Sequence, residues 1–354
     1  MATILHGFSA LKDVFSSPVV EKITEVNDAV TQAMAEHNRQ IEALYGLFCS
    51  RTTEKKVRFV GAAAAKLQSA DEFARTRPIK GGSKYDVAFP LLSAIGSLGK
   101  TWDAAQKMTV QQANNELANL FMADMRWQRG QIVAALCANA SWTHTNEEDG
   151  DLTIMGLANA DTVEYQIMTG ADTSATDTHY LAQSSAIDNS HDPFPTIRAE
   201  LMEHPENSGD VIALIPSDLK ASVMALSDFL PIADPRVRAG SGSAQLIGSL
   251  DFPIPGELFG YHQDKVWLAE WRALPSNYIV SVTTEGERAL KMREETLPAL
   301  RGFIKVADQS DHPFYKTTYK RIAGYGAWNR VGATVTRVGN ASYAVPTGYE
   351  CPMA

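Results

Sequence analysis

The sequence predicts an α+β fold in which one unusually long helix is surrounded by strand-rich segments. Residues 109–140 contain no proline and one glycine, and their apolar side chains recur at spacings of three and four. Residues 194–228 read as helix, strand and helix, and residues 298–345 are nearly all strand-like. At 1.5 Å per residue the helical stretch measures about 48 Å, whereas an average helix has about 11–12 residues.

The long helix should begin at Thr109, whose hydroxyl is placed to cap it, and should present one apolar face. Arg126 and Arg129 flank that face and are long enough to reach a partner beyond it. A core helix of an ordinary enzyme and a mechanical spine are both compatible with this pattern. The residues expected on the apolar face are Ala118, Phe121, Met122, Met125, Ile132, Val133 and Leu136.

Size and charge limit what the chain can be. Its 354 residues exceed the length of about 250–300 at which a single core stops growing, so we expect two or three subdomains. Lysine and arginine number 32 against 41 acidic residues, which gives a formal charge of −9. Such a chain is poorly suited to grip nucleic acid over a wide surface, but it would suit a wall that faces nucleic acid. No apolar run approaches about 18 residues, so we expect no transmembrane helix.

The sequence contains no recognisable catalytic, nucleotide-binding or metal-binding motif. The sequence has no GxxxxGKS loop, no GxGxxG between a strand and a helix, and no HExxH pair. Cys49, Cys137 and Cys351 form no CxxC motif, which fits a reducing compartment, and Cys137 is interpreted as an inert core thiol. The run His191-Asp192-Pro193 is interpreted as a turn. We therefore expect no enzyme, no cofactor and no metal site.

The first hundred residues predict an arm and a projecting hairpin. Residues 20–48 have helical periodicity after a segment without a clear period, and the helix could pack on its own domain or on a neighbouring subunit. Residues 55–60 and 84–92 are strand-like and are joined by a long polar excursion, far longer than the 2–5 residues of an ordinary hairpin loop.

Basic residues gather on that excursion and predict a contact surface. A nucleic-acid patch is one interpretation. Because Asp71, Glu72 and Asp86 are interleaved, we favour contact with an acidic neighbouring subunit. The candidate inter-subunit residues are Lys66, Arg75, Arg77, Lys80 and Lys84.

The rest of the chain predicts alternating elements. Residues 141–151 should form a solvated acidic turn rather than a calcium site, and 169–193 a polar surface insertion. Ser217 should cap a helix that runs to Leu226. Strands are expected at 266–269 and 278–283, followed by a helix-like piece at 286–295.

This order of elements resembles the major capsid protein of tailed bacteriophages, the Hong Kong 97-type fold. Gly156-Leu157-Ala158-Asn159 is similar to the Gly-Leu-Leu-Asn turn that follows the spine helix in many such proteins, with alanine in place of the second leucine. The run from Tyr325 to Ala333, YGAWNRVGA, is similar to their C-terminal strand pair. The similarity of element order covers nearly the whole chain.

The resemblance implies five segments. They are an N-terminal arm (1–50), an extended loop (51–100), a peripheral domain with the spine helix (101–204), an axial domain (205–305) and the C-terminal strands of the peripheral domain (306–354).

The resemblance also implies a function. Hexamers and pentamers would form an icosahedral shell around packaged double-stranded DNA without sequence-specific binding. The protein would be part of the virion, would assemble in the host cytoplasm, and could meet scaffold, portal and decoration proteins. An encapsulin-type compartment, which holds cargo protein, is the alternative with the same fold, and an α+β enzyme with an unrecognised site is a third possibility.

Overall fold

The computed structural model describes residues 23–60, 84–158, 163–168, 174–176, 178–232, 254–309 and 314–353. These residues form two compact units. Unit 1 comprises the described residues of Met1–Ala43, Leu91–Arg129 and Glu294–Ala323. Unit 2 comprises those of Leu44–Pro90, Gly130–Arg293 and Gly324–Ala354. The helix α4 (Val110–Cys137) and the strand β17 (Phe314–Ala327) each contribute residues to both units.

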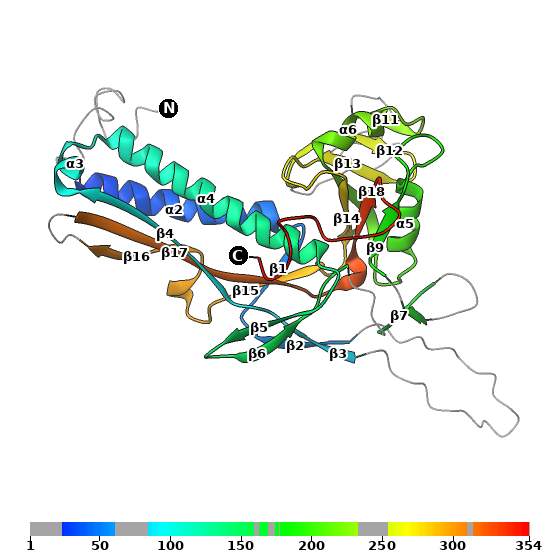
Figure 1. The fold of residues 1–354 in the computed structure, drawn as a ribbon, viewed down its shortest axis with the longest axis horizontal. Coiled ribbons are helices and arrows are strands. Elements are labelled where there is room, and N and C mark those ends of the chain that lie inside the picture. The colour runs from blue at the N-terminus through cyan, green and yellow to red at the C-terminus, as the bar shows by residue number, and fades with distance from the viewer. Residues whose placement is uncertain are drawn as a thin grey trace, which may run out of the picture. The chain divides into compact units, whose positions relative to one another are not determined.

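Unit 1 is a layer of helices on the strands β4, β17 and β16 (Figure 1), which belong to a five-stranded sheet with the order β1-β15-β17-β16 and with β4 also paired to β17. In the sheet β17 lies between β4 and β16, and Tyr319 of β17 is paired with Gly96 on one side and Lys305 on the other. Leu117, Phe303 and Tyr319 form the buried centre. The remaining elements of this unit are α2 (Ile23–Tyr45, up to Ala43), β4 (Leu92–Thr101), α3 (Trp102–Lys107), η3 (Pro298–Leu300) and β16 (Phe303–Gln309).

The predicted long helix is confirmed as α4, which has 28 residues. Its start is fixed by a reciprocal pair of bonds. The Gln112 N–H donates to Thr109 Oγ1 at 3.3 Å, and the Thr109 N–H donates to Gln112 Oε1 at 3.1 Å. This capping box satisfies two donors that a helix end otherwise leaves free. Neither α4 nor any other described helix has the length and apolar character needed to cross a membrane.

The apolar face predicted for α4 is wrong in its first half. Ala118 and Met122 are exposed, whereas Asp124 and Gln128 are buried. Phe121 is partly buried, and the later residues Ile132, Val133 and Leu136 are fully buried as predicted. The buried face therefore contains polar side chains, and a pattern based on apolar residues alone selects a neighbouring face.

A buried ionic network explains why that face is polar. Arg321 of β17 donates from Nε to Asp124 Oδ1 at 2.6 Å and from Nη2 to Asp124 Oδ2 at 2.7 Å. His37 of α2 lies 2.8 Å from the same Oδ2 through its Nε2, and its ring stacks on Phe121 with centroids 4.3 Å apart. Burial by itself raises the pKa of Asp124, but the hydrogen bonds from His37 and Arg321 outweigh it and leave that pKa below its ordinary value.

Unit 2 is built on a seven-stranded mixed sheet with the order β11-β12-β13-β10-β14-β18-β9. The pairs β10/β13 and β9/β18 are parallel, and the other neighbours are antiparallel. The elements are β9 (Tyr180–Gln183), α5 (Phe194–Met202), β10 (Ser208–Ile215), α6 (Ser217–Met224), β11 (Phe229–Pro231), β12 (Glu257–His262), β13 (Val266–Glu270), β14 (Tyr278–Glu285) and β18 (Ala333–Val338).

The core of unit 2 joins this sheet to its helices. Phe194 and Ile197 of α5 and Val223 of α6 pack in one buried cluster with Val211 and Leu268 of the sheet. The last five residues of β10 are all buried, which explains why this segment reads as a continuous apolar run rather than an alternation.

Among its described residues, unit 2 contains four further strand pairings, of which β1/β15 belongs to the five-stranded sheet and the other three are two-stranded sheets. The strand β1 pairs in parallel with β15, and three antiparallel pairs join β2 to β3, β5 to β6 and β7 to β8. Their bounds are β1 (Cys49–Thr52), β2 (Lys56–Val60), β3 (Lys84–Ala88), β5 (Trp142–Asn146), β6 (Gly150–Ile154), β7 (Glu164–Gln166), β8 (Ser174–Thr176) and β15 (Leu290–Glu294); η4 (Arg330–Gly332) precedes β18.

Three local predictions are wrong because distant partners decide them. The helix-like piece at 286–295 contains the strand β15, whose Leu290 N–H donates to Phe48 O at 2.9 Å. The expected insertion at 169–193 contributes β9, which pairs with β18. Ser217 does not cap α6. Pro216 occupies the cap position, and the Ser217 hydroxyl donates to the buried Glu270 at 2.8 Å.

We predict that Asp124→Asn lowers the free energy of unfolding by about 3–5 kcal/mol, because Arg321 would keep its charge in a buried site without a carboxylate. Chemical denaturation of the unassembled chain measures this change. The matched control Asp28→Asn removes the same charge from an exposed position of α2 and should change the free energy by less than about 0.5 kcal/mol. Equal effects of the two substitutions would contradict the role assigned to the network.

The carboxylate of Asp124 also makes the free energy of unfolding depend on pH. Because the pKa of Asp124 in the folded chain lies below its ordinary value of 3.8, its stabilising contribution is complete above pH 3.8. The contribution is lost as pH falls through the lowered folded pKa. The stability difference between wild type and Asp124→Asn should therefore shrink only below pH 3.8.

Candidate functional site

The two strands expected on either side of the basic segment are present in unit 2 as β2 and β3. They pair antiparallel from Lys56 opposite Ala88 to Val60 opposite Lys84. Lys84 is exposed at the end of this ladder, where the excursion 61–83 returns to the sheet. The other four candidates, Lys66, Arg75, Arg77 and Lys80, lie outside the described residues.

The base of the hairpin is anchored by aromatic packing. Phe59, Val87, Phe89 and Trp328 form a buried cluster, in which the Phe59 and Trp328 rings meet edge to face with centroids 5.1 Å apart. The Lys291 ammonium lies 3.5 Å from the centroid of the Trp328 ring. The hairpin therefore contributes side chains to a core of its own chain, and this core holds the two ends of the excursion in place.

Charges on the hairpin base are partly paired within the chain. The Arg58 guanidinium donates from Nε to Asp86 Oδ1 at 2.8 Å, and Lys56 Nζ lies 3.3 Å from Asp86 Oδ2. The hydrogen bond from Arg58 holds the pKa of Asp86 below its ordinary value. Asp86 is thus one of the interleaved acidic residues whose partner lies in the hairpin itself.

The acidic turn 147–149 reaches the same region through Asp149. The turn predicted over 141–151 is shorter in the structure, because 142–146 and 150–151 belong to the paired strands β5 and β6. Glu147 and Glu148 of the remaining turn are exposed as expected. Asp149, however, accepts from Arg293 Nη1 at 2.6 Å and from Nη2 at 3.2 Å. Arg293 Nη1 also donates to Phe89 O at 3.2 Å, so this ion pair joins the turn to the hairpin base. The hydrogen bond from Arg293 lowers the pKa of Asp149.

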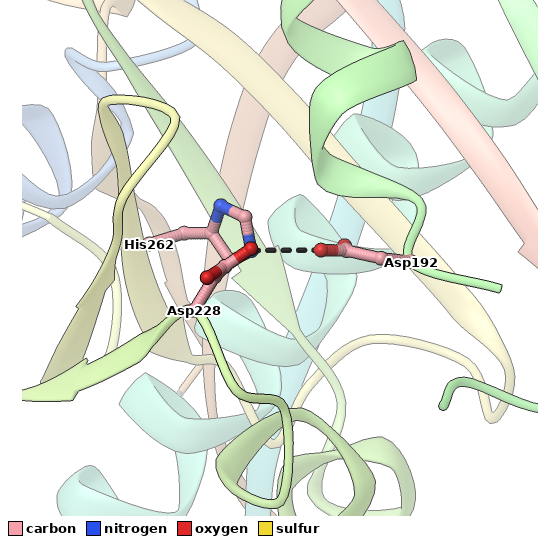
Figure 2. A group of neighbouring side chains, drawn as sticks. All are labelled: Asp192, Asp228 and His262. Atoms are coloured by element: carbon pink, nitrogen blue, oxygen red, sulfur yellow. Dashed lines mark hydrogen bonds and ion pairs between the residues drawn. The ribbon is translucent and has the colours of Figure 1, made fainter. Parts of the chain in front are cut away.

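A second arrangement, which the sequence search missed, is a histidine–carboxylate cluster of Asp192, Asp228 and His262 (Figure 2). Asp192 lies just before α5, Asp228 just before β11, and His262 is the last residue of β12. One ligand atom from each residue lies within 4.8 Å of the others. His262 is fully buried, Asp192 is partly buried and Asp228 is exposed.

Hydrogen bonds orient the ring of His262. Its Nε2 lies 2.8 Å from Asp192 Oδ2, and the Asp264 N–H donates to its Nδ1 at 3.3 Å. In this tautomer Nε2 donates to Asp192 and Nδ1 accepts. Among the described residues no hydroxyl or thiol is hydrogen-bonded to either ring nitrogen, so the cluster does not form a nucleophile–histidine–acid triad.

The local sequence contains only a weak signal for this cluster. His191 has the turn role expected of it, with its Nδ1 3.0 Å from Asp188 Oδ1, but its neighbour Asp192 faces His262, which is 70 residues away. The one available signal is a histidine at the end of an apolar strand with an aspartate two residues later. Cys137 is buried as expected, and burial raises the pKa of its thiol to about 12, which keeps it protonated.

Comparison with known proteins identifies the fold. No protein-family model and no curated protein match the sequence. A solved structure from Mycobacterium phage Patience is similar, with a TM-score of 0.68, 17% identity, and coverage of 92% of this chain and 91% of that chain. The capsid of the native GTA particle matches with a TM-score of 0.50 and 13% identity over 84% of this chain and 90% of that chain. The predicted α+β class and phage-capsid type of fold are confirmed.

We predict that Phe59→Ala destabilises the hairpin base by about 3–5 kcal/mol, the usual effect of truncating a buried phenylalanine. Amide hydrogen exchange of residues 56–60 and 84–88 reports this directly and should become faster. Val60→Ala is a matched control on the next residue, whose side chain is 58% exposed, and it should leave the exchange rates nearly unchanged. Slow exchange in both variants would mean that Phe59 does not anchor the hairpin.

Proposed function

We propose that this chain is the major capsid protein of a tailed bacteriophage, which assembles into the hexamers and pentamers of an icosahedral shell around double-stranded DNA. The observation that carries the proposal is the similarity of fold over about nine-tenths of both chains to a phage structure. The fold of the GTA capsid supports the same role. The role is structural rather than enzymatic, needs no cofactor, and places the protein in the virion after assembly in the host cytoplasm.

Unit 1 offers surface for contact between subunits. On the sheet, Ile95 of β4 and Phe314 of β17 are 68% and 62% exposed, and Val306 of β16 is 53% exposed. Met122 of α4 is 48% exposed. Large apolar side chains at the surface are favoured in the buried centre of protein interfaces, where their transfer from water stabilises association.

Net charge supports a shell that encloses DNA without holding it. The formal charge of −9 opposes tight, sequence-independent adhesion to a polyanion, which depends on neutralising phosphates. DNA inside such a shell would be confined rather than bound in a sequence-specific manner. Scaffold, portal and decoration proteins are the further partners that this role calls for.

We assign the segments accordingly. Residues 1–50 are the N-terminal arm, 51–100 the extended loop, 101–204 with 306–354 the peripheral domain, and 205–305 the axial domain. The β2–β3 pairing supports the second assignment, because it brings the two ends of the excursion 61–83 together at a packed base. Within this scheme Lys66, Arg75, Arg77, Lys80 and Lys84 contact an acidic surface of the neighbouring subunit.

Negative-stain electron microscopy of the purified protein tests the shell. Expression with its cognate scaffold should give closed particles or capsomers of uniform size. A protein that stays monomeric at high concentration, or that runs as a small oligomer as an enzyme would, contradicts the proposal. Particles that hold a cargo protein instead of DNA would identify an encapsulin-type compartment.

Charge reversal at Arg75 and Arg77 tests the basic cluster. Replacing both with glutamate should block assembly while the circular dichroism of the unassembled chain stays unchanged. Each exposed ion pair contributes only about 0–1 kcal/mol, but many copies act together and the contact should weaken with salt. The control exchanges both residues for lysine, which preserves the charge and should preserve assembly. Normal assembly of the reversed variant with failed DNA packaging would make this cluster a nucleic-acid site.

A further inference from the structure

We propose that Asp192, Asp228 and His262 form a binding site for one divalent transition-metal ion, with Zn²⁺ as the best match. Imidazole nitrogen and carboxylate oxygen together are typical ligands of zinc and its neighbours, whereas calcium and magnesium prefer oxygen alone. The site lies within unit 2 and does not depend on whether the chain assembles into a shell.

Backbone pairing brings two of the three ligands together. Phe229 of β11 is paired with His262 of β12, and the Gln263 N–H donates to Asp228 O at 3.1 Å. The positions of Asp228 and His262 are therefore fixed by the same antiparallel ladder. A site built on paired strands holds its ligands more precisely than one built on free loops.

The third ligand is held by the start of α5. Asp192 Oδ1 accepts from the Phe194 N–H at 3.0 Å, which leaves Oδ2 facing His262. The Phe194 ring lies 5.1 Å from the His262 ring, centroid to centroid, and the two rings are tilted by 41°. Figure 2 shows the three side chains converging from their separate elements.

The spacing of the ligands suits an ion after a small adjustment. Zinc bonds of about 2.0–2.2 Å in tetrahedral geometry place neighbouring ligand atoms about 3.4 Å apart. In the structure Nε2 of His262 and Oδ2 of Asp192 are closer, at 2.8 Å, because a hydrogen joins them, and the whole group lies within 4.8 Å. Metal binding would displace the hydrogen from Nε2 and move these two atoms apart. The ring stays neutral, because this hydrogen is transferred through solvent to Nδ1.

A carboxylate lies near the other ring nitrogen of the histidine. Asp264 Oδ2 lies 3.5 Å from His262 Nδ1. When the metal occupies Nε2, the ring hydrogen resides on Nδ1, so the hydrogen bond from the Asp264 N–H to Nδ1 is lost and the Asp264 carboxylate must move closer to accept the ring hydrogen. Such outer carboxylates fix the tautomer and orientation of a ligating histidine. Asp264 is thus a third carboxylate at the site, near the ring nitrogen that does not face Asp192.

Charge and access also favour a cation. No lysine or arginine among the described residues is ion-paired with Asp192, Asp228 or Asp264. Three carboxylates therefore surround one imidazole without a cationic partner in that part of the chain. Because Asp228 is exposed, an ion can enter from solvent and keep water on its remaining positions.

Zinc titration of the full chain, stripped with a chelator and then dialysed, tests the site. Isothermal calorimetry with ZnCl₂ should give one saturable site per chain. Asp228→Asn keeps the shape of an exposed side chain and should weaken that site at least about tenfold. Glu257→Gln is the matched control, because it removes one exposed charge from the strand that carries His262 and should leave zinc affinity unchanged.

Two further measurements decide the identity of the site. X-ray absorption at the zinc edge should show nitrogen and oxygen ligands with no sulfur, and CaCl₂ should bind at least about tenfold more weakly than ZnCl₂. Absence of saturable zinc binding, equal zinc affinity in wild type and Asp228→Asn, sulfur in the zinc shell, or preference for calcium would each overturn the proposal.

Discussion

The buried charge pair between Asp124 and Arg321 is the constraint on which unit 1 depends. A carboxylate without a partner would be costly at this depth, so α4 must present Asp124 to β17. His37 of α2 and Gln128 of α4 also contact Asp124 Oδ2, at 2.8 and 3.0 Å. Asn38, one residue further along α2, extends the network. Its Oδ1 accepts from both Arg321 and the Phe303 N–H, at 2.9 and 2.8 Å. These hydrogen bonds thereby fix the positions of α2, α4, β16 and β17 relative to one another.

Apolar side chains in unit 1 pack directly around this polar network. Phe121 stacks on His37, and Phe303 stacks on Tyr319 with centroids 5.7 Å apart. These rings pack beside the ion pair, which contacts the same face of α4. Ala118 and Met122 are exposed, which leaves one apolar side chain of this helix free for a partner.

Unit 2 is organised differently, because a large apolar layer joins its sheet to its helices, although Arg330, Ser281 and Thr334 are also buried in this unit. The seven-stranded sheet buries valine, leucine and isoleucine against α5 and α6. The ion pair of Arg293 with Asp149 lies at the base of the β2–β3 hairpin. His262, hydrogen-bonded to Asp192, lies at one end of the β11–β12 pair. Both arrangements occur where strands end, which is where side chains from separate elements can converge without breaking a ladder.

Periodicity and turn chemistry in the sequence were sufficient for the α+β class, the long helix with its Thr109 cap, the β2–β3 hairpin and the strands of the C-terminal region. These features depend on residues close together in the chain, so local patterns report them. Tertiary structure alone decided which face of α4 is buried, that 290–294 is a strand, and that Asp192 meets His262. Each of these depends on a hydrogen bond or ion pair between residues far apart in sequence, and local propensity carries no information about such partners.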